Sequence, residues 1–214
     1  MEENYIFFDL KEALTEQDIV FILTLCDELL PPPISSSVTQ TKGTIERTIT
    51  SYLDRETLKA FSRNKYGIEY DSGMEKPGIR ISKIDGGGLI SIPLVNKDEY
   101  HLTKKIALRL VEGMVLKGMS VAPVKFTEFK QQYKANRRTV DYPGLYWLQF
   151  YGAEEFKKQG GTVILDNPYI DAMLIKDGIF IQVGESPYEV HTPEGKERMI
   201  KANKVMPPVI KDDN

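Results

Sequence analysis

The sequence predicts an α+β fold: a largely antiparallel sheet with helices packed on it, in one compact domain. Short apolar runs separated by Gly-rich turns predict two hairpins, and a helical pattern follows each of them. A strand that is apolar on both faces predicts a sheet interior. The 214 residues suffice for a core that buries about 70% of the unfolded surface.

We expect one domain over residues 1–206 and a frayed tail over 207–214. Each half of the chain ends in a hairpin followed by a helix. This order leaves open an internal duplication.

The first half begins with a short apolar run over residues 5–8, a candidate first strand. A helix over residues 16–30 follows, for which Thr15 is the expected N-cap. Its apolar residues recur at the i, i+3, i+4, i+7 spacing of a buried stripe, and Cys26 belongs to that stripe. Three prolines at 31–33 end the helix, because the residue before a proline avoids helical geometry. The polar run 35–42 is then expected to be a surface loop.

A strand over 44–52 follows, and Asp54 is expected to cap a short helix. The clearest hairpin of this half has arms at 78–84 and 89–95 around a Gly-rich turn. Pro93 cannot donate to a sheet ladder, so the second arm is expected at a sheet edge or at a bulge.

A helix over 99–116 comes next, with Asp98 as its expected cap and Gly118 as the residue just past its end. The segment 124–138 then contains five basic residues and one acidic residue, the strongest charge asymmetry in the chain. Its interpretations are a solvated helix face or an anion-binding patch.

Residues 142–152 contain the only tryptophan, Trp147, in the densest aromatic run of the chain. With a period of two, both faces of this strand are largely apolar, which predicts the interior of a sheet. The later elements are a short helix over 153–158, a hairpin over 169–183 and a final helix that Thr192 caps.

Composition excludes several functional classes. The net charge of −3 disfavours a general nucleic-acid binder, so we expect no nucleic-acid partner. The longest apolar run falls far short of the roughly 20 residues of a membrane span, and a Met-Glu-Glu start is unlike a signal peptide. We therefore expect a cytoplasmic protein without membrane attachment, in which Cys26 is a buried structural thiol.

No residue pattern amounts to a catalytic or cofactor site. Gly86, Gly87 and Gly88 lack the following Lys-Ser/Thr of a phosphate loop. His101 and His191 have no neighbours at metal-ligand spacing, so we expect no metal and no cofactor. Two loop carboxylates could still meet in a cleft and act as acid and base. The candidates for such a hydrolase are Asp71, Glu75, Asp85, Asp166, Asp171, Glu185 and Glu189.

One resemblance covers about a quarter of the chain. Pro143-Gly-Leu-Tyr-Trp-Leu, a later strand Ile179-Phe-Ile-Gln-Val, Ser186-Pro-Tyr and Thr192-Pro resemble bacterial immunity proteins of polymorphic-toxin and type VI secretion systems. The resemblance implies a non-enzymatic protein that binds and occludes a cognate toxin. It supplies no binding residues, and the basic segment 124–138 departs from the acidic surface expected opposite a nucleic-acid-binding toxin.

We expect the toxin contacts to come from loops on a rigid scaffold. The predicted contact residues are Asp71, Glu75, Glu185, Tyr188 and Glu189. Their carboxylates would steer a basic toxin face and the tyrosine would anchor it, and reversing Glu185 and Glu189 should leave the melting temperature nearly unchanged. The alternatives are a hydrolase and a phage or mobile-element structural or assembly protein, and the sequence leaves a homodimer open.

Overall fold

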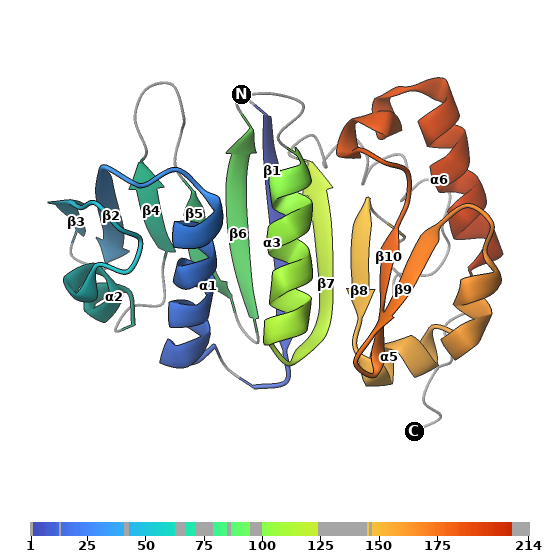
Figure 1. Cartoon of the computed structure of the whole chain (residues 1–214), viewed down its shortest axis with the longest axis horizontal. Helices are drawn as coiled ribbons and strands as arrows, with labels where there is room; N and C mark the ends of the chain where they lie inside the picture. Colours follow the sequence, from blue (N-terminus) through green and yellow to red (C-terminus); the bar gives the residue numbers. More distant parts are fainter. Residues whose placement is uncertain are drawn as a thin grey trace. The chain divides into compact units, whose positions relative to one another are not determined.

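The structure is a computed structural model that describes residues 2–12, 14–40, 43–62, 67–71, 79–84, 87–94, 100–123, 145 and 147–206. It confirms an α+β fold with antiparallel strand pairs (Figure 1). The chain divides into two compact units, Met1–Val115 and Leu116–Asn214. The expectation of a single domain over 1–206 stays a prediction.

The first unit contains six strands in the order β3-β2-β4-β5-β6-β1. Their bounds are β1 Glu2–Leu10, β2 Ser35–Gln40, β3 Gly43–Thr48, β4 Gly67–Asp71, β5 Arg80–Ile84 and β6 Gly87–Leu94. Its helices are α1 Glu16–Leu29, α2 Arg55–Ser62 and α3 Tyr100–Gly113. Helices α1 and α3 contact each other and lie across one face of this sheet (Figure 1).

A row of β-branched side chains crosses five strands of this sheet in register. Its members are Val38, Ile68, Ile81, Ile90 and Ile6, each at most 1% exposed. Along β1 the side chains alternate, with Ile6 and Phe8 buried and Phe7 and Asp9 exposed. The sheet therefore buries one face against the helices and leaves the other more open.

Helix α1 begins where the sequence predicts. The Thr15 hydroxyl accepts the Asp18 N–H at 3.2 Å, and the Asp18 carboxylate accepts the Thr15 N–H at 2.8 Å. This capping box satisfies two backbone donors that the first turn leaves without a helical partner. Cys26 is fully buried, which confirms a structural thiol, and burial raises the pKa of that thiol.

The expectation of a loop over 35–42 is wrong, because residues 35–40 form strand β2 between β3 and β4. The run of serine and threonine carries no apolar alternation that would predict a strand. Pairing on both sides supplies the stability that the side chains lack. The Ser36 hydroxyl, 2% exposed, hydrogen-bonds the Thr57 hydroxyl of α2 at 2.9 Å.

Two further expectations in this unit need correction. Strand β6 lies inside the sheet, between β5 and β1, so Pro93 is not on an edge strand. The described pairing with β5 ends at Ser91 opposite Arg80, and Pro93 lies beyond it. Helix α3 ends at Gly113 instead of 116, and Gly118 belongs to the next strand.

The second unit contains four strands in the order β7-β8-β10-β9. Their bounds are β7 Leu116–Pro123, β8 Leu148–Tyr151, β9 Asp171–Ile175 and β10 Gly178–Gln182. The helical segments are α5 Ala153–Lys158, η2 Gly161–Asp166, η3 Pro187–His191 and α6 Pro193–Val205. In both units a hairpin precedes a longer helix, as the sequence predicts.

The aromatic strand occupies the interior of this sheet. All four residues of β8 are buried between β7 and β10, and Trp147 just before it is 1% exposed. Tyr151 packs with β10 and α6 residues, including Ile179, Ile181 and Met199. The strand is shorter than predicted, and residues 142–144 and 146 lie outside the described part of the chain.

The segments 124–138 and 207–214 also lie outside the described residues, so their predictions stay untested. In the described ranges, no helix has the length and apolar character that crossing a membrane requires.

Candidate partner-binding surface

Three of the predicted contact residues lie in one short connection between β10 and α6. We call this connection, residues 184–192, the η3 segment, because it contains the short helix η3. The Val183 N–H donates to the Trp147 carbonyl at 2.9 Å, which attaches the start of the connection to the core. Gly184 follows with φ 77°, a left-handed conformation that favours glycine. A Cβ at this position would also contact the Glu189 carboxylate. The chain therefore turns sharply here against a carboxylate.

Glu189 holds this segment together. Its Oε1 accepts the Glu185 N–H at 2.7 Å, and its Oε2 pairs with the Arg198 guanidinium of α6 at 3.2 Å. Its carbonyl accepts both the N–H and the hydroxyl of Thr192, the residue that caps α6. One residue thus joins the exit of β10 to the start of the last helix.

The neighbouring predicted residues differ in what they offer a partner. Glu185 is exposed. Tyr188 is half-buried, and its hydroxyl oxygen is inaccessible to solvent, so the polar end of this anchor points inward. Within the η3 segment, Glu185 is therefore the predicted side chain best placed to meet another molecule.

The other two predicted residues belong to the first unit. Asp71 is exposed at the end of β4, where its carbonyl accepts the Ile34 N–H at 2.7 Å. Glu75 lies outside the described residues. The structure thus brings Glu185, Tyr188 and Glu189 into one segment, and the role of all five residues in binding stays a prediction.

The expected indifference of the melting temperature to charge reversal at Glu185 and Glu189 needs correction. Reversal at Glu189 would break the bond to the Glu185 N–H and place a cation beside Arg198. A loss of binding in that double variant could then reflect altered structure. Glu185 alone is the informative position.

We expect Glu189→Ala to lower the free energy of unfolding by about 1–2 kcal/mol, because it removes a charge-assisted bond and a half-exposed ion pair. Glu185→Ala, which removes an exposed carboxylate and keeps the backbone N–H that bonds Glu189, should change it by less than about 0.5 kcal/mol. Urea unfolding of the two variants measures the difference. Equal stabilities would show that the Glu189 contacts do not hold the segment.

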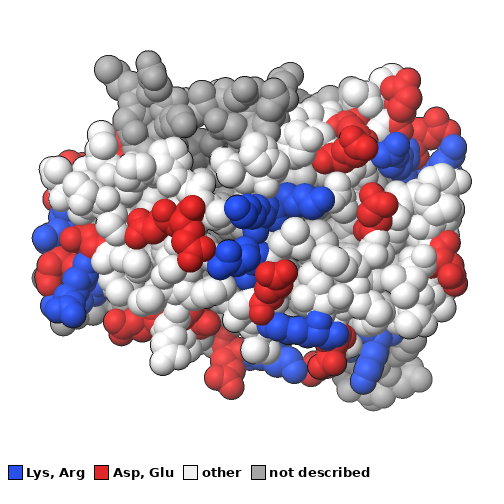
Figure 2. All heavy atoms as spheres, in the orientation of Figure 1, with Lys and Arg blue, Asp and Glu red and all other residues white. Residues whose placement is uncertain are grey.

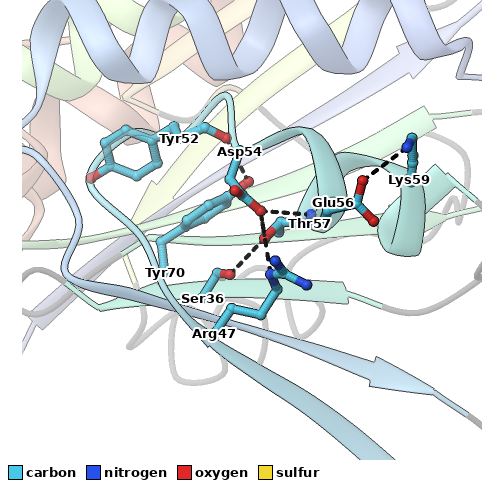
Figure 3. A network of polar contacts seen from close by, with 8 residues as sticks. All are labelled: Ser36, Arg47, Tyr52, Asp54, Glu56, Thr57, Lys59 and Tyr70. Atoms are coloured by element: carbon cyan, nitrogen blue, oxygen red, sulfur yellow. Dashed lines mark hydrogen bonds and ion pairs between the residues drawn. The ribbon is translucent and has the colours of Figure 1, made fainter.

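A second polar cluster lies in the first unit, around Asp54 (Figure 3). The Asp54 carboxylate accepts the Thr57 N–H at 2.8 Å and the Thr57 hydroxyl at 2.6 Å, and Arg47 lies 3.6 Å away. The Thr57 hydroxyl also contacts Ser36, and both residues are almost completely buried. A buried hydroxyl whose proton goes to a capping carboxylate is not presented to a substrate. This cluster is the N-cap of α2, as the sequence predicts for Asp54.

The Asp54 cap makes stability depend on pH. Burial raises the pKa of Asp54, but the bonds from Thr57 and the Arg47 charge lower it, and its net pKa lies below the usual 3.8. A carboxyl whose folded pKa is depressed stabilises the fold above its unfolded pKa and loses this contribution as the pH falls through the folded pKa. We expect the stability difference between the wild type and Asp54→Asn to be full at neutral pH and to shrink below about pH 3.8. A difference that stays constant across this range would contradict the assignment.

The carboxylates of the hydrolase alternative are distributed over both units. Asp166, Asp171 and Glu185 are exposed in the second unit, Asp71 is exposed in the first, and Glu189 is in its ion pair. Glu75 and Asp85 lie outside the described residues. In the described part of the chain, no group of three or more His, Cys, Asp or Glu could hold a metal ion.

The sequence does not indicate one surface feature, the exposure of the apolar outer strand β9. Met173 and Leu174 are 49% and 55% exposed there. The run Asp171-Ala-Met-Leu-Ile175 has no apolar and polar alternation, so its sequence does not distinguish a covered strand from an exposed edge.

On the described part of the face in Figure 2, acidic and basic side chains are interspersed. Specific contacts on this face would then depend on individual residues more than on a single-sign field.

Neither a protein-family model nor a curated protein matches the chain. Among solved structures, it is similar to the Pseudomonas aeruginosa T6SS protein PA0821, with a TM-score of 0.54 and 13% sequence identity. The similarity covers 100% of this chain and 76% of that one. At this identity the likeness shows a shared fold.

Proposed function

We propose that this protein is a non-catalytic immunity protein that binds a cognate bacterial toxin in the cytoplasm and blocks it. The observation that carries the proposal is the shared fold with a T6SS protein over the whole chain. The Trp147 strand and the Ser186-Pro-Tyr and Thr192-Pro motifs, which resemble immunity proteins, support it independently.

The construction of the η3 segment supports the same function. An immunity protein must recognise one toxin, so its contact residues have to vary while the scaffold stays fixed. The η3 segment fits this requirement, because hydrogen bonds of Glu189 and Thr192 fix its backbone while the Glu185 side chain stays exposed. An exposed carboxylate on a fixed backbone suits a basic toxin surface, since charge at a rim accelerates encounter more than it adds affinity.

Protection of cells tests the proposal. The probe is the protein encoded by the gene directly beside this one, produced from an inducible promoter in a host that lacks both genes. We expect that protein to stop growth and co-expression of this chain to restore it. Growth arrest that this chain does not relieve, with both proteins present in soluble form, would overturn the proposal.

Charge reversal then locates the contact. Glu185→Lys should weaken protection without changing the melting temperature, since its side chain is exposed. The matched control is Glu46→Lys, at an exposed glutamate of β3 outside the predicted set. Protection that both variants preserve equally would exclude Glu185 from the interface and leave the immunity proposal itself intact.

A further inference from the structure

Strand β9 is the outermost strand of the second unit's sheet, and among the described strands it pairs only with β10 (Figure 1). Ile175 lies opposite Gly178 across a two-residue turn. The two residues that close such a turn are hydrogen-bonded to each other. Along an antiparallel ladder, hydrogen-bonded pairs alternate with pairs that are not hydrogen-bonded. Ala172 and Leu174 therefore direct their backbone N–H and C=O groups away from β10, toward the open edge.

This edge lacks the features that usually keep an edge strand unpaired. Its centre is Met173 and Leu174, about half exposed, and the strand has no proline and no charge except at Asp171. Strand β3, at the end of the other unit's sheet, has Glu46 and Arg47 in its middle. Native proteins block sheet edges with such charges. An apolar edge with backbone groups directed outward is therefore free to pair with another strand.

We propose that the occupant is the β9 strand of a second copy of this chain, joined antiparallel about a two-fold axis with Met173 opposite Met173 of the other copy. The dimer surface does not depend on the proposed toxin binding. A two-fold interface uses the same patch on both copies, so the strand has to be complementary to itself.

The register follows from the strand itself. Opposed residues must keep their side chains on the same face, so alternative registers differ by shifts of two residues. With Met173 at the centre, all five residues of β9 are paired, and Ala172 of one copy exchanges backbone bonds with Leu174 of the other. A shift in either direction leaves only three paired residues of the strand, and one of these shifts places Asp171 opposite Asp177 of the second copy.

Charge favours the antiparallel direction. Asp171 begins the strand and Lys176 follows its end. An antiparallel copy brings the acidic end of one strand beside the basic side chain at the end of the other, whereas a parallel copy would bring like charges together. In the centred register, no charged residue of the strand lies opposite a like charge.

Sedimentation over a concentration series tests the surface. The wild type is expected to show a concentration-dependent dimer. Met173→Lys places two like charges directly opposite each other and should raise the dissociation constant about tenfold or more. Ile45→Lys is the matched control, because Ile45 is 40% exposed on β3, the edge strand of the first unit, and it should dimerise like the wild type. A wild type that stays monomeric up to its solubility limit would overturn the proposal, and so would a dimer that Met173→Lys leaves unchanged.

Cysteine cross-linking tests the register without adding charge. Opposed non-hydrogen-bonded residues have Cα atoms about 4.5 Å apart, within the range of a disulfide. Met173→Cys should therefore give a covalent dimer under mild oxidation, and Leu174→Cys, which lies opposite Ala172 in this register, should give little. Cys26 is 0% exposed and does not interfere. Equal cross-linking at both positions, or none at 173, would refute the register. Loss of toxin protection with an intact dimer would bear only on the proposed function.

Discussion

Trp147→Ala is expected to lower the free energy of unfolding by about 3–5 kcal/mol, through lost burial and the cavity left behind. Trp147 is 1% exposed, directly before the central strand β8, and its carbonyl accepts the N–H of Val183, the residue just before the η3 segment. Urea unfolding followed by circular dichroism measures the change. Trp147→Phe, which keeps a ring in the same space, should cost clearly less.

The native fluorescence provides a second readout of the same burial. Trp147 is the only tryptophan, so all tryptophan emission of the protein comes from this site. We expect a blue-shifted maximum that moves to longer wavelength on unfolding. Emission typical of a water-exposed indole in the native protein would contradict the interior position of this strand.

Ile81→Ala is expected to cost about 3 kcal/mol, since Ile81 is fully buried at the middle of the row that crosses the first unit's sheet. Ile45→Ala is the matched control, because Ile45 lies opposite Val38, just beyond the outer end of this row, and is 40% exposed. The control should cost less than about 1 kcal/mol. Similar losses at both positions would mean that burial along the row does not determine its contribution.

The sequence predicted those elements whose signals are local. Thr15 and Asp18 form the expected cap of α1, and Thr192 caps α6 as expected. Trp147 is buried directly before the central strand β8, because a strand apolar on both faces has no stable exposed position. Periodicity and capping chemistry depend on residues a few positions apart, so a single sequence contains them.

The parts that were missed depend on contacts between distant residues. Residues 35–40 became a strand because β3 and β4 pair with them, although three consecutive serines favour a turn or loop. In the sequence, Glu189 is one of several acidic residues expected in loops. In the structure, the Arg198 guanidinium and the Glu185 N–H fix its carboxylate. The exposure of Met173 became visible only when the order of the strands placed β9 at an edge.

Titration calorimetry with two purified proteins tests whether this chain binds a toxin. The purified chain is titrated into the protein encoded by the adjacent gene, and the heat and stoichiometry of binding are measured. We expect saturable binding with one copy of this chain for each toxin, weakened by Glu185→Lys and unchanged by Glu46→Lys. Absence of any binding heat at several temperatures, together with separate elution of the two folded proteins, would contradict it.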